Sequence, residues 1–187
     1  MDPLTQGVLG AALPQAIAKK TFAIRAGLFG FLAGMAADLD TFIRSSEDPL
    51  LYLEYHRQFT HSLIFIPFGG LLCGLFLYWV IGRRGNLSLG QRVLYCILGY
   101  ATHGLLDACT SYGTQLFWPF SDERISWNAV SIIDPLFTLP LLVGVVFAGL
   151  KQNPIFVRVA LVWGIFYMSF GVYQRDAAIT MGKELAT

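Results

Sequence analysis

Six apolar stretches constrain the fold of this chain more than any other feature of its sequence. A helix needs about 20 apolar residues to cross a bilayer, so the first stretch is too short to span alone. Charged residues make up 13% of the chain, whereas a soluble domain carries about 25%. We expect an all-α, polytopic membrane helix bundle with about five spanning helices and a short N-terminal membrane helix. The stretches are residues 4–18, 26–43, 62–82, 92–109, 132–150 and 154–173.

The chain of 187 residues is short enough to form a single membrane-embedded domain over residues 1–187, closed by a polar tail at 174–187. A net charge of +1 gives no reason to expect nucleic-acid binding. The three cysteines, Cys73, Cys96 and Cys109, share no CxxC spacing, so neither a disulfide framework nor a cysteine-ligated metal is expected. Glycines in the second stretch, Gly27, Gly30 and Gly34, favour close helix packing.

Charges divide unevenly between the two sets of loops that alternating segments create. One set contains eight basic residues and no acid; the other, counted with the adjoining helix ends, contains all twelve Asp and Glu residues. Basic loops remain on the cytoplasmic side of a membrane protein, so the acidic set is predicted to face away from the cytoplasm. The chain is therefore expected to be an integral cytoplasmic (inner) membrane protein. The basic set is Lys19, Lys20, Arg25, Arg83, Arg84, Arg92, Lys151 and Arg158.

An imidazole and a carboxylate lie four residues apart, at His103 and Asp107, near the outer end of the fourth stretch. In a helix this spacing places both side chains on one face, where they can bind one divalent metal. Ionisable groups within a membrane helix are costly and usually functional. The alternative is a pair that hydrogen-bonds to itself and caps the helix.

The remaining histidines and several carboxylates fall at the same predicted membrane face. An N/O ligand set of this kind suits Zn²⁺, Mn²⁺ or Fe²⁺, and it exceeds the needs of one four-coordinate ion, so one or two ions are expected. Asp134, before Pro135, could instead cap a helix, and Asp122 could be a solvated loop charge. Thr60 is expected to cap a helix as well. The candidate metal ligands are Asp38, Asp40, His56, His61, His103, Asp107 and Asp134.

Metal-assisted hydrolysis is the chemistry that this set favours, with a water activated by the metal as nucleophile and a spare carboxylate as general base. Asp40 and Arg57 are the candidate catalytic residues, since a guanidinium can stabilise an anionic transition state. Arg57 could equally be a surface arginine bound to lipid headgroups. No GxSxG or HExxH motif is present, which argues against a serine hydrolase or a common zinc protease.

With these residues in view, the chain resembles the YdjM-like family of membrane-bound metal-dependent hydrolases. That family is similar to the superfamily of zinc-dependent phospholipases C and single-strand nucleases, which implies hydrolysis of a phosphoester. The resemblance rests on seven motifs in order along the chain: Met1-Asp2-Pro3-Leu4-Thr5, Ala37-Asp38-Leu39-Asp40, His56-Arg57-Gln58-Phe59-Thr60-His61-Ser62, His103-Gly104-Leu105-Leu106-Asp107, Thr110-Ser111-Tyr112-Gly113-Thr114, Trp118-Pro119-Phe120-Ser121-Asp122 and Ile133-Asp134-Pro135.

One position departs from the family pattern: Gln6 stands where the family usually has histidine, so one metal position is lost or weakened. The expected partners are the bilayer and a lipid or lipid-linked phosphoester substrate. Two alternatives remain open. One is a metal or ion transporter, and the other is a non-catalytic membrane scaffold with a degenerate metal site.

Overall fold

The structure, a computed structural model, describes residues 1–45, 47–48, 51, 55–81 and 87–185. Within these ranges the chain is helical, and an isolated bridge between Thr114 and Ile125 is the only strand-like pairing. Three helical segments are long and apolar enough to cross a membrane, namely Lys20–Phe42, Leu63–Ile81 and Ile155–Leu185, and Pro135–Leu150 is a shorter apolar helix. The expected all-helical membrane bundle is confirmed.

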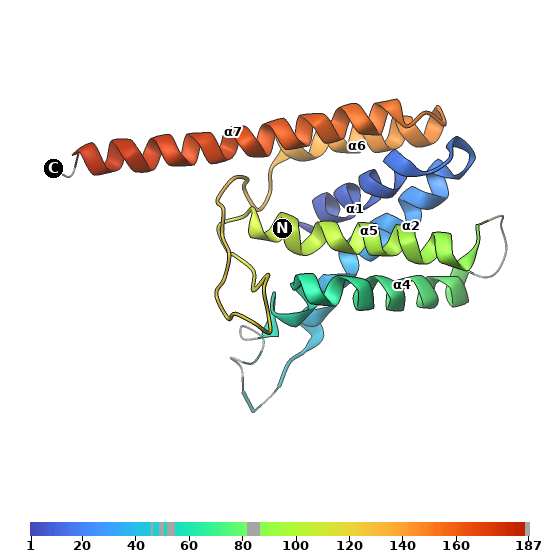
Figure 1. Ribbon diagram of the computed structural model, residues 1–187, viewed down its shortest axis with the longest axis horizontal. Coiled ribbons are helices and arrows are strands. Elements are labelled where there is room, and N and C mark those ends of the chain that lie inside the picture. Colours follow the sequence, from blue (N-terminus) through green and yellow to red (C-terminus); the bar gives the residue numbers. More distant parts are fainter. Residues whose placement is uncertain (46, 49–50, 52–54, 82–86, 186–187) are drawn as a thin grey trace.

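The helices lie in three layers (Figure 1). α1 (Pro3–Ile17), α2 (Ala23–Ala36) and α5 (Leu89–Ala108) form the middle, and α1 packs against both of the others. α4 (Ile66–Ile81) packs on α5 from one side. α6 (Pro135–Leu150) and α7 (Ile155–Leu185) pair on the opposite side, where α6 contacts α1. α5 therefore lies between its neighbours, and 11 of its 20 residues are buried.

Glycines bring the three middle helices into backbone contact. A Cβ atom at Gly30 would collide with the Gly10 carbonyl oxygen, and a Cβ atom at Gly99 would collide with the Gly30 carbonyl oxygen. This is the close approach that the glycines of the second stretch predict. It fixes the positions of α1, α2 and α5 relative to one another, and with them the side chains at their ends.

Local sequence signals set where the helices begin and end. Asp2 caps α1 through its carboxylate, which accepts from the Thr5 amide at 3.0 Å. Ser88 and Gln91 form a capping box at the start of α5. α2 ends at Ala36, and the chain continues as the 3₁₀ helix η2 (Ala37–Phe42). Two further 3₁₀ turns, η3 (Phe59–His61) and η4 (Leu63–Phe65), lead into α4.

One end of the bundle collects the start of α1, the end of α5, η2, η3 and the long loop that follows α5 (Figure 1). The turn between α1 and α2 and the turn between α6 and α7 lie at the other end, with Lys19, Lys20 and Lys151. Arg83 and Arg84 of the predicted basic set lie outside the described residues. The separation of histidines from basic turns that the sequence predicts is thus present in the fold.

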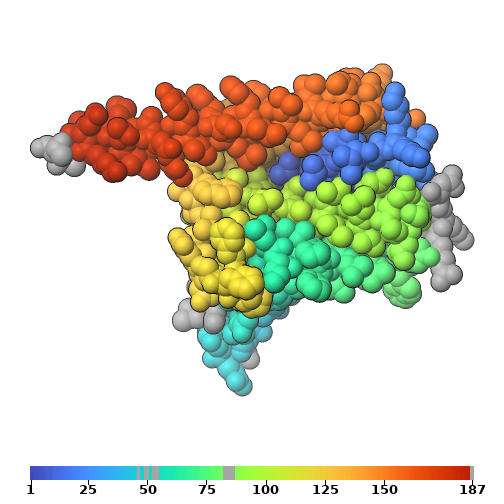
Figure 2. Space-filling view, in the orientation of Figure 1, coloured from blue at the N-terminus to red at the C-terminus, as the bar shows by residue number. Residues whose placement is uncertain are grey.

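Most of the polar tail expected at residues 174–187 is helical, because α7 continues as one helix to Leu185. Ala177, Ala178 and Met181 are strong helix formers, and no proline interrupts this segment. The extension projects beyond the bundle at the end that carries the histidines (Figure 2). Residues 186–187 lie outside the described part of the chain.

Candidate metal centre

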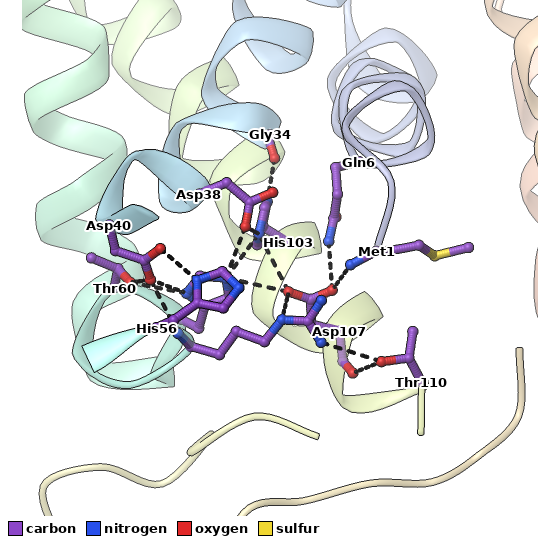
Figure 3. Close-up of polar contacts among 12 residues, drawn as sticks. Met1, Gln6, Gly34, Asp38, Asp40, His56, Thr60, His103, Asp107 and Thr110 are labelled. Carbon is purple, nitrogen blue, oxygen red and sulfur yellow. Dashed lines mark hydrogen bonds and ion pairs between the residues drawn. The ribbon is translucent and has the colours of Figure 1, made fainter. Parts of the chain in front are cut away.

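Four predicted ligands meet at the start of η2, the end of η3 and the last two turns of α5. The ligand atoms of Asp38, His61, His103 and Asp107 all lie within 4.8 Å of one another. The side chains of His61, His103 and Asp107 are 0% exposed, whereas that of Asp38 is 25% exposed. Figure 3 shows Asp38, His103 and Asp107 converging on one point from two different elements. Asp38 is therefore the one member of the four that solvent can reach.

Five of the distances among these ligand atoms are close to those around a tetrahedral zinc ion. His61 Nε2 lies 3.0 Å from His103 Nε2, 3.2 Å from Asp107 Oδ2 and 3.5 Å from Asp38 Oδ1. His103 Nε2 lies 3.3 Å from Asp38 Oδ1 and 3.5 Å from Asp107 Oδ2. Zinc bonds of about 2.0–2.2 Å in a tetrahedron imply ligand-to-ligand distances of roughly 3.3–3.6 Å. The residues present thus fit a Zn²⁺-sized ion with two nitrogen and two oxygen donors.

Hydrogen bonds on the far side of each ring point both Nε2 atoms inward. His103 Nδ1 lies 2.5 Å from the Gly34 carbonyl oxygen, which can only accept, so Nδ1 is the donor. His61 Nδ1 lies 2.9 Å from Thr60 Oγ1 and 3.3 Å from Asp40 Oδ2. Because the Thr60 hydroxyl donates to Asp40, it accepts from His61. Donation from Nδ1 to an oxygen is how metal-binding histidines are usually oriented.

Two neutral rings held in this way would direct their Nε2 lone pairs at each other, so a positive charge between them is required. Burial lowers the pKa of His61, but hydrogen bonds to the carboxylates of Asp107, Asp38 and Asp40 outweigh burial and raise it to about 10. In the metal-free protein the carboxylates around His61 therefore favour its protonated form at neutral pH. A divalent cation can replace that proton and satisfy all four donors.

The 3₁₀ helix η2, which follows α2, explains how two carboxylates so close in sequence both contact His61. Side chains two residues apart on a 3₁₀ helix point about 120° away from each other. Asp38 therefore faces Nε2 of His61, while Asp40 faces its Nδ1. η3 lies directly on α5, since a Cβ at Gly104 would collide with the His61 carbonyl oxygen.

Asp40 and His56 form a second group beside the first. The ligand atoms of Asp38, Asp40 and His56 also lie within 4.8 Å of one another. His56 Nδ1 lies 2.8 Å from Asp40 Oδ1. Asp40 Oδ2 accepts from the Arg57 amide at 3.1 Å and from the Thr60 hydroxyl at 2.7 Å. With its oxygens engaged by three residues, Asp40 holds its neighbours in position, and Asp38 links the two groups.

Arg57 connects the centre to the loop that follows α5. Its backbone has φ +62°, a left-handed conformation that non-glycine residues rarely adopt, and it is 6% exposed. Nε lies 3.3 Å from Asp107 Oδ2, and Nη1 donates to Thr110 Oγ1 at 3.4 Å. The guanidinium lies over the Tyr112 ring, 4.6 Å from its centre. A strained backbone at a buried charged residue is typical of a functional position.

Three residues near the centre have roles that the sequence did not predict. Gln6 Nε2 donates to Asp107 Oδ1 at 3.0 Å, and the Met1 amino group forms an ion pair with the same oxygen. Thr60, expected as a cap, instead bridges Asp40 and His61, and the side chain of Gln58, the N-cap of η3, makes no cap hydrogen bond. In the sequence, only the departure from the family histidine at position 6 pointed to Gln6 as part of the centre.

Asp134 lies apart from both groups. One of its oxygens accepts from the Phe137 amide at 3.1 Å, which makes it the N-cap of α6, and the Tyr167 hydroxyl donates to the other at 2.9 Å. The structure therefore realises the capping alternative for this residue and does not bring it to the other candidate ligands. Asp122 is exposed in the loop and belongs to neither group of described residues.

Comparison with known proteins agrees with the membrane fold. No solved structure matches the chain. An uncharacterized protein, YfhP of Bacillus subtilis, is 28% identical over 142 residues, which cover 72% of this chain and 42% of the relative. The inner membrane protein YbcI of Escherichia coli is 37% identical over 82 residues, which cover 41% of this chain and 44% of the relative. The chain thus spans less than half the length of these relatives.

The family described as "YdjM inner membrane protein" matches residues 1–178, which include every residue of the centre. The family description and the name of the Escherichia coli relative both place such proteins in the inner membrane. The chain therefore belongs to the YdjM inner membrane protein family.

Proposed function

We propose that this protein is a membrane-bound metal-dependent hydrolase that cleaves a phosphoester of a lipid or lipid-linked substrate. The observation that carries the proposal is the convergence of two imidazoles and two carboxylates, whose ligand atoms lie within 4.8 Å of one another beside a buried guanidinium. A divalent ion held there would act as a Lewis acid and lower the pKa of a water it binds. Zn²⁺ fits the distances best, and Mn²⁺ or Fe²⁺ would accept the same donors.

The residues of the chain take distinct roles in this proposal. His61, His103 and Asp107 hold the ion, and Asp38, the most exposed of the four, accepts the proton of the attacking water. Arg57 stabilises negative charge on the phosphoryl oxygens through its guanidinium. Asp40 acts by holding the rings of His56 and His61, because its oxygens already accept hydrogen bonds.

A second ion is compatible with the neighbouring group of Asp38, Asp40 and His56. Two ions sharing one carboxylate could clamp the attacking and leaving oxygens of a phosphoester. We propose that the centre faces away from the cytoplasm, because the basic turns lie at the opposite end of the bundle.

A non-catalytic scaffold with a structural metal is the second candidate. In this candidate Asp38 binds the ion as well, and four protein ligands make a closed site, the arrangement that structural zinc prefers, whereas catalytic zinc usually retains an open position. Gln6 strengthens this candidate, since its buried Oε1 has no hydrogen-bond partner among the described residues. The two candidates differ in turnover rather than in metal binding.

The test is to strip and reload the purified protein with Zn²⁺, Mn²⁺ or Fe²⁺ and to measure hydrolysis of bis(p-nitrophenyl) phosphate and of a phospholipid. Wild type and Gln6→His are expected to hydrolyse a phosphodiester, and His103→Ala is expected to lose both metal and turnover. Asp134→Asn, outside the centre, is the control for general damage. Tight metal binding with no turnover in either form of position 6 would favour the scaffold.

A further inference from the structure

A groove of about 300 Å³ opens between the end of α2 and α4, on the flank of the metal centre. We propose that this groove binds the acyl chain of the lipid substrate, so that the scissile phosphoester reaches the centre sideways from the bilayer. The inference rests on the proposed function and adds the substrate class and its route. A volume near 300 Å³ is at the lower end for ligand sites.

The mouth of the groove faces lipid. It is lined by Leu39 and Leu72, both 61% exposed, and by Ile43 and Cys73, which are half-buried. Leu39 belongs to the helical segment Lys20–Phe42, which Ile43 directly follows, and Leu72 and Cys73 belong to Leu63–Ile81; both segments are long and apolar enough to cross a membrane. An exposed apolar recess in such helices is accessible to hydrocarbon chains rather than to water-soluble ligands.

The inner end of the groove reaches the hydrogen-bond network of the centre. Asp40 and Thr60 line it, and both interact with Nδ1 of His61. The Tyr100 hydroxyl donates to the Thr60 carbonyl oxygen at 2.8 Å and forms part of the lining. Figure 3 shows Asp40 and Thr60 on the α4 side of the centre, and Gln6 and Met1 on the opposite side. The groove therefore extends from an exposed apolar mouth to two residues in contact with His61.

Two larger recesses lack this continuity. A groove of about 540 Å³ between α6 and α7 is lined by apolar residues such as Val143 and Val159 and by no titratable group. A cavity of about 740 Å³ beside α7 is lined by Asp134 and Tyr167, and by no residue of the metal group. The α2–α4 groove alone among these three is lined by a residue that contacts His61.

The test measures binding of methyl-, hexyl- and decylphosphonate to zinc-loaded protein in phospholipid nanodiscs. The phosphonate occupies the metal centre, and the chain reports on the groove. In the wild type, decylphosphonate should bind more tightly than methylphosphonate, and Leu72→Trp, which fills the mouth, should reduce that gain by at least about tenfold. Methylphosphonate should bind both proteins equally.

Leu71→Trp is the matched control, because Leu71 is an exposed neighbour on α4 that does not line the groove. It should leave the chain-length gain unchanged, and zinc content together with helical circular dichroism should show that both variants fold. Binding of methylphosphonate with an equal chain-length gain in wild type and Leu72→Trp would overturn the groove while sparing the proposed function. Failure of every phosphonate to bind would overturn both.

Discussion

His61 and His103, 42 residues apart in sequence, place their Nε2 atoms 3.0 Å from each other in the interior of the bundle. Neither ring is free to turn away, because the Gly34 carbonyl oxygen holds one Nδ1 and Thr60 with Asp40 holds the other. The pair is therefore a rigid two-nitrogen donor, and its behaviour towards metal and protons can be tested directly.

Removing one ring should abolish tight metal binding. His103→Ala leaves three of the four donors, and we expect its zinc affinity to fall more than about tenfold. Inductively coupled plasma mass spectrometry on protein dialysed against buffered zinc measures this loss. Asp134→Asn should retain wild-type zinc, because asparagine still caps α6; equal loss in that variant would show that the effect is not local to the centre.

Asp40 should affect zinc affinity mainly by orienting the histidine rings, rather than as the sole ligand. Asp40→Asn keeps an oxygen near the rings of His56 and His61 but removes the negative charge, and we expect zinc affinity to fall about 10–100-fold. Competition with a fluorescent chelator gives the affinity. Zinc binding as tight as in the wild type would contradict the orienting role of this carboxylate.

Metal binding should release protons. The pKa of His61 is raised to about 10, so this ring is protonated at pH 7 in the metal-free protein and must lose its proton to bind zinc. Zinc affinity should therefore rise as pH increases towards 10 and fall as pH decreases. Isothermal titration in buffers of different ionisation enthalpy should show release of about one proton at pH 7. A heat of binding that does not depend on the buffer would be inconsistent with this.

Two glycines of α5 should respond in opposite ways to alanine. Gly104→Ala forces η3 away from the helix, since the new Cβ meets the His61 carbonyl oxygen, and should cost about 1–3 kcal/mol. Gly90→Ala, with only Ser88 Oγ at 4.0 Å, should stabilise the helix by about 0.5–1 kcal/mol. Thermal unfolding in detergent compares them, and similar melting temperatures would argue against the close approach.

The left-handed backbone of Arg57 predicts an order of stability between two truncations. Both Arg57→Gly and Arg57→Ala remove the guanidinium, but only alanine is strained at φ +62°. Arg57→Gly should therefore be the more stable by about 1 kcal/mol. Unfolding in mixed micelles measures the difference; a more stable alanine variant would mean that this backbone is not strained.

The sequence alone was sufficient to predict the helices and the end of the bundle at which the ligands gather. Residues 4–18 became α1 (Pro3–Ile17), and residues 132–150 became α6 (Pro135–Leu150). Apolar stretches are local features, so they can be found without knowledge of the fold. The spacing of His103 and Asp107 likewise placed both on one face of α5.

Only the tertiary structure decided which polar residues meet and in what role. It separated Asp38 from Asp40 across the two sides of His61, assigned Asp134 to a cap, and paired Arg57 and Gln6 with Asp107. These pairings depend on how closely glycine contacts let three helices approach and on the switch of α2 to a 3₁₀ turn. Both set side-chain positions to within about 1 Å, a precision that periodicity and composition do not contain because they describe each helix alone.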